Sequence, residues 1–173
     1  MNLATGTWEI SGNLKDINGY TLFSQNIACV FHKFIDCFGV DVMTRIDLYV
    51  DNAISMTGHT PIVTPILKKY LIIKLGVDDF SNSEKTVFQF AHELCHYVFY
   101  SLKGFDKEKS TDREESVCAA MSLVFIKTMF PNNLDAWKHC LLNSENKGYR
   151  LGVKVASDVN FEIMKLRDII ISF

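Results

Sequence analysis

The segment Val87–Leu102, VFQFAHELCHYVFYSL, decides the fold, because its apolar residues cover most of the circumference of a helix. A helix that is apolar on nearly every side is a buried one. Ser81 and Glu84 stand just ahead of this segment with the S-x-x-E spacing of a capping box, which predicts that the helix begins there. We therefore expect Val87–Leu102 to be a long core helix.

Two histidines and a glutamate interrupt this apolar segment as His92-Glu93-Leu94-Cys95-His96. Residues four apart share a helix face, so both imidazoles can bind one Zn2+ ion. Glu93, about 100° round the axis, then stands beside the remaining coordination positions as a general base. Burying two imidazoles and a carboxylate without partners would be costly, and a bound metal satisfies all three. The alternative is a pair of core histidines that hydrogen-bond backbone or carboxylate groups.

A catalytic zinc ion usually has three protein ligands, so a third is expected downstream. No histidine follows at the spacing H-E-x-x-H-x-x-G-x-x-H, since Gly104 is out of register and the next histidine is His139. The next predicted helix offers carboxylates instead. If Thr111 is its N-cap, the Glu114 side chain reaches back to the cap and leaves Glu115 free as the third ligand. Glu114 remains the alternative, and both could be solvated acids favoured by the helix dipole.

The helix that carries these glutamates is predicted over Val117–Phe130, opened by the Thr111 cap and ended by Pro131. Cys118, Ala119 and Ser122 follow Glu115 at spacings of three, four and seven residues. A face of such small side chains allows close approach. We expect this face to pack against the helix that contains the histidines.

The rest of the chain predicts strands first and helices last. A first strand is predicted over residues 6 to 14, and a helix over Tyr20–Phe38 that ends at Gly39. The remaining predicted elements are strands at Arg45–Val50, Thr60–Ile66 and Tyr70–Leu75 and helices at Leu134–Leu142 and Asp158–Ile171. This order indicates an α+β fold with a small sheet.

Composition narrows the class of protein. With 173 residues and 48% hydrophobic residues, the chain is expected to form a single domain spanning residues 1–173. Eighteen basic and twenty acidic residues leave a net charge of -2, which gives no general attraction to nucleic acid or anionic membranes. Neither a secretory leader nor a membrane span is expected, and five cysteines without CxxC spacing favour free thiols in a cytoplasmic protein.

The ordered motifs resemble those of the ImmA/IrrE-type metallopeptidases, a group of bacterial and phage zinc proteases. Val87–His96 is similar to the family's aromatic-x-x-A-H-E-L-G-H core, with Cys95 in place of the usual glycine. Tyr70–Leu75 resembles its upstream strand, and Glu115–Val124 its glutamate helix. The resemblance implies a small zincin-like domain with two histidines, one glutamate and a zinc-bound water. It also implies a protein substrate such as a DNA-binding repressor.

Together these observations predict a zinc-dependent endopeptidase with His92, His96 and Glu115 as ligands and Glu93 as the catalytic base. A zinc-binding interaction module without turnover is the alternative, although the presence of Glu93 argues against it. A further donor is expected to stabilise the oxyanion. Its candidates, between which spacing does not choose, are Tyr97, Tyr100, His139, Tyr149 and Arg150. Cys95 is expected to be a buried small residue, although its thiol could approach the metal.

Overall fold

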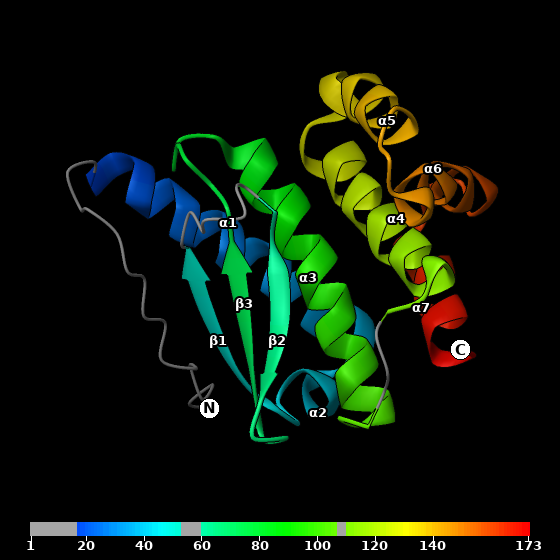
Figure 1. The fold of residues 1–173 in the computed structure, drawn as a ribbon. Helices are drawn as coiled ribbons and strands as arrows, with labels where there is room; N and C mark the ends of the chain where they lie inside the picture. The colour runs from blue at the N-terminus through cyan, green and yellow to red at the C-terminus, as the bar shows by residue number, and fades with distance from the viewer. Residues whose placement is uncertain (1–16, 53–59, 107–109) are drawn as a thin grey trace.

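A computed structural model describes residues 17–52, 60–106 and 110–173. The described chain has an α+β fold, as predicted (Figure 1). Its elements are α1 (Ile17–Phe38), α2 (Val40–Met43), β1 (Asp47–Asn52), β2 (Ile62–Ile66), β3 (Tyr70–Leu75), α3 (Ser83–Lys103), α4 (Asp112–Met129), a short 3-10 turn (Pro131–Asn133), α5 (Leu134–Leu142), α6 (Lys147–Asp158) and α7 (Ile163–Ile171). The strand predicted over residues 6 to 14 lies outside the described residues.

The three described strands form a mixed sheet in the order β1-β3-β2. β1 runs parallel to β3, whereas β2 runs antiparallel to it. The three residues 67–69 join β2 to β3, with Leu67 and Lys68 both in the left-handed region at φ 53. Such a turn matches the twist of a tight hairpin. Because β2 stands at one end of the order β1-β3-β2, it is an edge strand of the sheet within the described residues.

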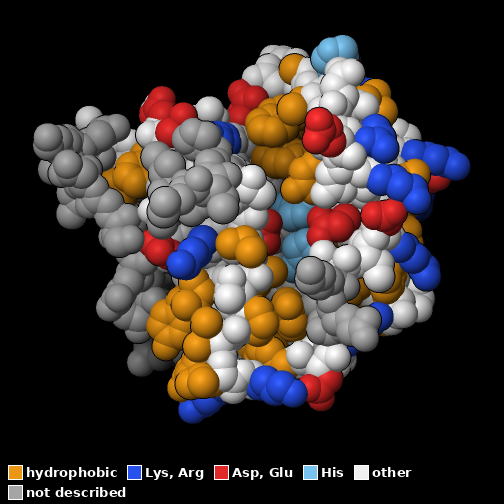
Figure 2. Space-filling view, viewed as in Figure 1, with side chains coloured by type: hydrophobic (Ala, Val, Ile, Leu, Met, Phe, Trp, Pro, Cys, Tyr) orange, Lys and Arg blue, Asp and Glu red, His pale blue; other side chains and the backbone are white. Residues whose placement is uncertain are grey.

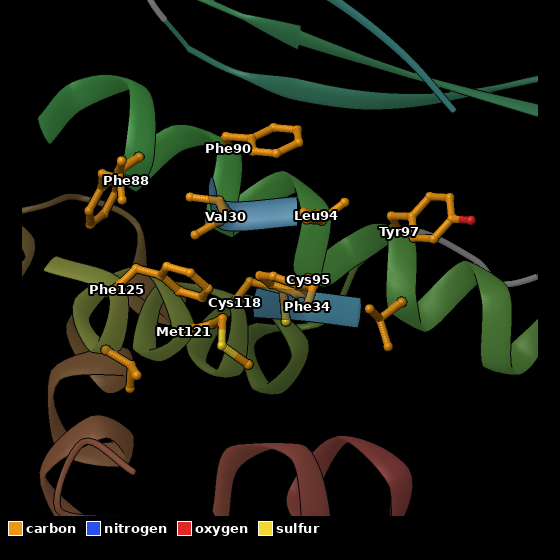
Figure 3. Packing of buried hydrophobic residues seen from close by; sticks show 14 of the residues in the cluster. Val30, Phe34, Phe88, Phe90, Leu94, Cys95, Tyr97, Cys118, Met121 and Phe125 are labelled. Carbon is orange, nitrogen blue, oxygen red and sulfur yellow. The ribbon is translucent and has the colours of Figure 1, made fainter. Parts of the chain in front are cut away.

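Helix α3 occupies the centre of the molecule, with the sheet on one side and α4 on the other (Figure 1). Its residues from Thr86 to Phe99 are all buried, as its apolar sequence predicts. Figure 3 shows Cys95 of α3 close to Cys118 and Met121 of α4 in the core between the two helices. The histidine motif thus lies on a helix whose central turns are buried in the close-packed core.

The start of α3 differs from the prediction. Asn82, and not Ser81, is the N-cap, and its side chain accepts a hydrogen bond from the Lys85 N–H. Ser81 instead donates to the Asp79 carboxylate through both its N–H and its hydroxyl. Glu84 does not reach back to the cap, because its carboxylate accepts hydrogen bonds from the side chains of Asn133 and Trp137. The predicted capping box is therefore wrong, although the helix begins where expected.

The C-terminal part of the chain also differs from the prediction. The helix predicted over Asp158–Ile171 is wrong in its first turn, because Asn160 and Phe161 adopt left-handed conformations that separate α6 from α7. α6 itself was missed by the sequence prediction. It packs along α4, and Gly152 makes the contact close: a Cβ there would lie 2.6 Å from the Cβ of Ala119.

Candidate metal centre

The crossing of α3 and α4 brings two histidines and one glutamate together. His92 Nε2 lies 3.2 Å from Glu115 Oε2, and His96 Nε2 lies 3.4 Å from Glu115 Oε1. One ligand atom from each of these three residues falls within 4.8 Å of the others. Both histidines are buried and Glu115 is half-buried, so the group is largely shielded from water. The three residues predicted as metal ligands are thus brought together.

Glu114 lies on the other side of His96. Its Oε1 is 2.7 Å from His96 Nδ1, the ring nitrogen that faces away from Glu115. The Thr111 cap is confirmed, because its hydroxyl accepts from the Glu114 N–H, but the Glu114 side chain does not return to the cap. Glu114 therefore orients His96 through its outer nitrogen, as a carboxylate commonly does behind a metal-binding histidine.

Glu93 is buried beside the two histidines, with 4% of its surface exposed. Burial raises the pKa of the Glu93 carboxyl; the two histidines oppose this effect and Glu115 adds to it. A hydrogen bond from the Val63 backbone N–H also favours the ionised form. Glu93 therefore lies between α3 and β2, where a carboxylate with a raised pKa is suited to accept a proton.

Charge in the site is balanced between carboxylates and imidazoles. Burial opposes protonation of His96, but its contacts with Glu114 and Glu115 outweigh burial and raise the pKa of the imidazole to about 10. Burial would raise the pKa of Glu115, yet His92 and His96 hold it well below its usual range. Three carboxylates thus gather around two imidazoles, and this group favours added positive charge at its centre.

The donor set fits a zinc ion, which prefers imidazole nitrogen and carboxylate oxygen. His92 Nδ1 is a buried atom without a hydrogen-bond partner among the described residues. Because Nε2 is the His92 nitrogen that faces Glu115, Nδ1 is turned away from the point where the three ligand atoms meet, and the fit to zinc rests on the donor set. Figure 2 shows histidine side chains at the bottom of a hollow in the centre of this face, with acidic side chains beside them. A ligand can therefore reach the site from solvent.

Tyr149 of α6 is a site residue that sequence reasoning named but did not select. Its ring lies edge-on to His92, with 5.2 Å between ring centroids. Gly148 permits this approach, since a Cβ there would stand 2.3 Å from the Cβ of Glu115. Burial and the negative charges of Glu93 and Glu115 raise the pKa of the Tyr149 phenol well above its ordinary value. The hydroxyl thus stays a hydrogen-bond donor.

Two of the other candidate donors, Tyr97 and Arg150, form hydrogen bonds away from the site. The Tyr97 hydroxyl donates to backbone carbonyls that precede β1. Arg150 donates to backbone carbonyls in the loop before α6, and His139 is exposed on α5. The Tyr100 ring packs against Phe105, and burial together with the negative charge of Glu114 raises the pKa of its phenol. Tyr149 is the candidate whose ring lies against a histidine of the metal centre.

The small-residue face of α4 packs on α3, as predicted, because the Ser122 hydroxyl donates to the Phe88 carbonyl of that helix. Part of the face also meets α6, since Ala119 lies against Gly152. Cys95 and Cys118 are fully buried in the core, and the group of candidate ligands excludes them. Burial, reinforced by the neighbouring Cys95, raises the pKa of the Cys118 thiol.

No protein-family model, curated protein or solved structure matches the chain. The resemblance to ImmA/IrrE-type metallopeptidases therefore stays a prediction from the motifs, and function must be inferred from the site. None of the helices in the described ranges has both the length and the hydrophobicity needed to cross a lipid bilayer.

Proposed function

We propose that the protein is a zinc-dependent endopeptidase with a zincin-like site. The observation that carries the proposal is the grouping of His92, His96 and Glu115 ligand atoms within 4.8 Å, with the buried Glu93 next to them. A core histidine pair would need hydrogen-bond partners alone. It would not need the Glu115 carboxylate at the point where both imidazoles meet, nor Glu93 as a second buried acid beside them.

His92, His96 and Glu115 are the residues that would hold the zinc ion, with Glu114 fixing the His96 ring. When bound, zinc acidifies a water molecule and polarises a carbonyl group. Glu93 accepts the proton of the attacking water and delivers it to the leaving amine. Tyr149, whose ring lies against His92 and whose phenol stays protonated, would donate a hydrogen bond to the oxyanion.

The edge strand β2 supports a peptide as the substrate. β2 is in contact with α3, its Val63 backbone lowers the pKa of the Glu93 carboxyl, and Pro61 just before it lines the pocket with His92, so the strand borders the site. An edge strand offers backbone groups to which an extended peptide can add as a further strand. The choice of a DNA-binding repressor as the protein substrate rests on the sequence resemblance alone.

The first experiment measures zinc per chain by elemental analysis after purification without chelator. We expect about one zinc ion in the wild type, since three ligands make a complete protein contribution to a catalytic site. Glu115→Ala should lose the metal. Glu114→Ala should retain it but bind it about 10–100-fold more weakly, because only the orientation of His96 suffers. Glu145→Ala, at an exposed position outside the site, is the matched control. A wild type that stays metal-free in added zinc would refute the proposal.

The second experiment tests turnover with Glu93→Gln on a peptide library read by mass spectrometry. The variant should keep zinc and lose about 10²–10⁴-fold in cleavage rate, because the amide cannot accept a proton. Cleavage by Glu93→Gln at the wild-type rate would contradict the role of the base. Zinc binding without cleavage in the wild type, together with partner binding by both forms, would favour the interaction module.

A further inference from the structure

A pocket of about 330 Å³ opens directly beside the metal centre. It runs along α3 from Asn82 to His92 and is bounded on the far side by the chain that leads into β2. Residues that line it include Pro61, Phe88, Gln89, His92, Trp137 and Tyr149. Figure 2 shows a group of hydrophobic side chains above the histidines in the central hollow. The pocket therefore joins an apolar wall to the proposed zinc ligand His92.

The apolar wall is held in a fixed position. The rings of Phe88 and Trp137 stack with 4.3 Å between centroids and 13° between planes. Trp137 Nε1 donates to Glu84 Oε2 at 3.0 Å, and Glu84 also accepts from the Asn133 amide. A wall built from two stacked rings and tied by a hydrogen bond loses little freedom when a ligand binds. The pocket is therefore preorganised for an apolar group.

The size of the pocket limits what it can hold. Ligand pockets commonly span about 300–1,000 Å³, so this one is at the small end of the range. It suits one bulky side chain and is too small for a large cofactor. His92 and Tyr149 both line this pocket and both belong to the candidate metal centre, so the pocket adjoins the place where a substrate bond would be cut.

We propose that this pocket binds an aromatic or large aliphatic side chain of the substrate, in the residue next to the bond that is cut. The inference rests on the proposed endopeptidase function and names the specificity that Trp137 and Phe88 give it. Alanine or glycine at this substrate position would leave the aromatic wall uncovered and lose the contribution of apolar burial.

The test uses saturation-transfer NMR with two small probes, N-acetyl-L-phenylalaninamide and N-acetyl-L-alaninamide, on metal-free and zinc-loaded protein. We expect the phenylalanine probe to bind at least about tenfold more tightly in both forms, because the apolar wall does not depend on the metal. Trp137→Ala should abolish this preference. Tyr49→Ala, which removes an exposed aromatic ring from the outer face of the sheet, is the matched control and should keep it.

A second measurement needs no change in the pocket. In a Trp8→Phe background Trp137 is the only tryptophan left of two, and the phenylalanine probe should alter its fluorescence. Equal binding of both probes, or a preference that survives Trp137→Ala, would overturn the inference. These outcomes are separate from failure of the endopeptidase proposal, which shows as missing zinc in elemental analysis. In an active enzyme, cleavage beside small residues alone would also overturn the inference.

Discussion

At the scale of single residues, His96 contacts two adjacent glutamates of α4, and each glutamate has a different role. Its Nδ1 contacts Glu114 at 2.7 Å, whereas its Nε2 faces Glu115 at 3.4 Å. A helix turns about 100° per residue, so consecutive glutamates point in different directions and meet opposite sides of the ring. One carboxylate can therefore fix the imidazole while the other takes part in metal binding.

Tyr149→Phe tests the residue assigned to the oxyanion. Loss of one oxyanion donor typically lowers kcat by about 10²–10³-fold, and we expect a fall of this kind with KM little changed. The ring that packs on His92 is kept, so zinc content should equal that of the wild type. Steady-state kinetics on a cleaved peptide, with the exposed Tyr49→Phe as the matched control, measure this effect. An unchanged kcat would remove Tyr149 from the mechanism.

At the scale of elements, α6 depends on two glycines spaced four residues apart. Gly148 lies against Glu115, and Gly152 lies against Ala119, so one face of α6 approaches the backbone of α4. A Cβ at either position would meet atoms fixed to the α4 backbone, which cannot rotate away. The approach of α6 determines where Tyr149 stands and supports the turn of α4 that carries Glu115.

Gly148→Ala should therefore destabilise the fold and weaken the metal centre together. Overpacking typically costs about 1–3 kcal/mol, which exceeds the roughly 1 kcal/mol that alanine gains over glycine in a helix. We expect Gly152→Ala to be similarly destabilised in urea unfolding but to retain more zinc, since it presses on Ala119 rather than Glu115. Lys154→Ala, exposed on α6, controls for helix propensity. Equal zinc affinity in the two glycine variants would contradict this assignment.

Elements with strong local signals could be predicted from the sequence. The apolar circumference of α3 and the Thr111 cap of α4 are local patterns, and the structure agrees with both. Ser81 and Asn82 are both residue types that favour the N-cap position. Asn82 takes this position because Ser81 donates hydrogen bonds to Asp79 instead. The contact of α6 with α4 is tertiary. Only the Gly148-x-x-x-Gly152 spacing could have indicated it.

The same contrast applies to the candidate site. His92, Glu93 and His96 follow from one helix period, so sequence alone predicts that they lie together. The prediction of Glu115 rested on the Thr111 cap, which is correct, and on a return of the Glu114 side chain to that cap, which is wrong. The partner of Glu114 is a ring nitrogen of His96 on α3. Tyr149 could not be selected, because its position depends on the packing of α6.

At the scale of the whole molecule, the core does not depend on the site. The buried cluster extends from Phe23 of α1 through the sheet and α3 to Ile170 of α7. Phe34 of α1 stacks on Phe125 of α4 with 5.5 Å between ring centroids, far along α4 from Glu115. Hydrophobic burial of this extent is the dominant stabilising contribution in a folded domain. The contacts of His96 with Glu114 and Glu115 also join α3 to α4 without a metal.

Removal of zinc should therefore lower the Tm without unfolding the chain. A metal that binds only the folded state stabilises it by RT ln(1 + [L]/Kd), which is about 2.7 kcal/mol at one hundred times Kd. For a chain of this size the change corresponds to about 5–10 °C. Thermal unfolding followed by circular dichroism, with chelator and then with restored zinc, measures the shift.

Glu115→Ala should show almost none of this shift, whereas Glu145→Ala should behave as the wild type because its side chain is exposed and outside the site. Loss of the helical signal when chelator is added at low temperature would instead mean that metal binding and folding are one process, as in small zinc domains. The buried core argues against that outcome, because apolar side chains and not the candidate metal ligands make most of the contacts that join α1 to α3 and α3 to α4.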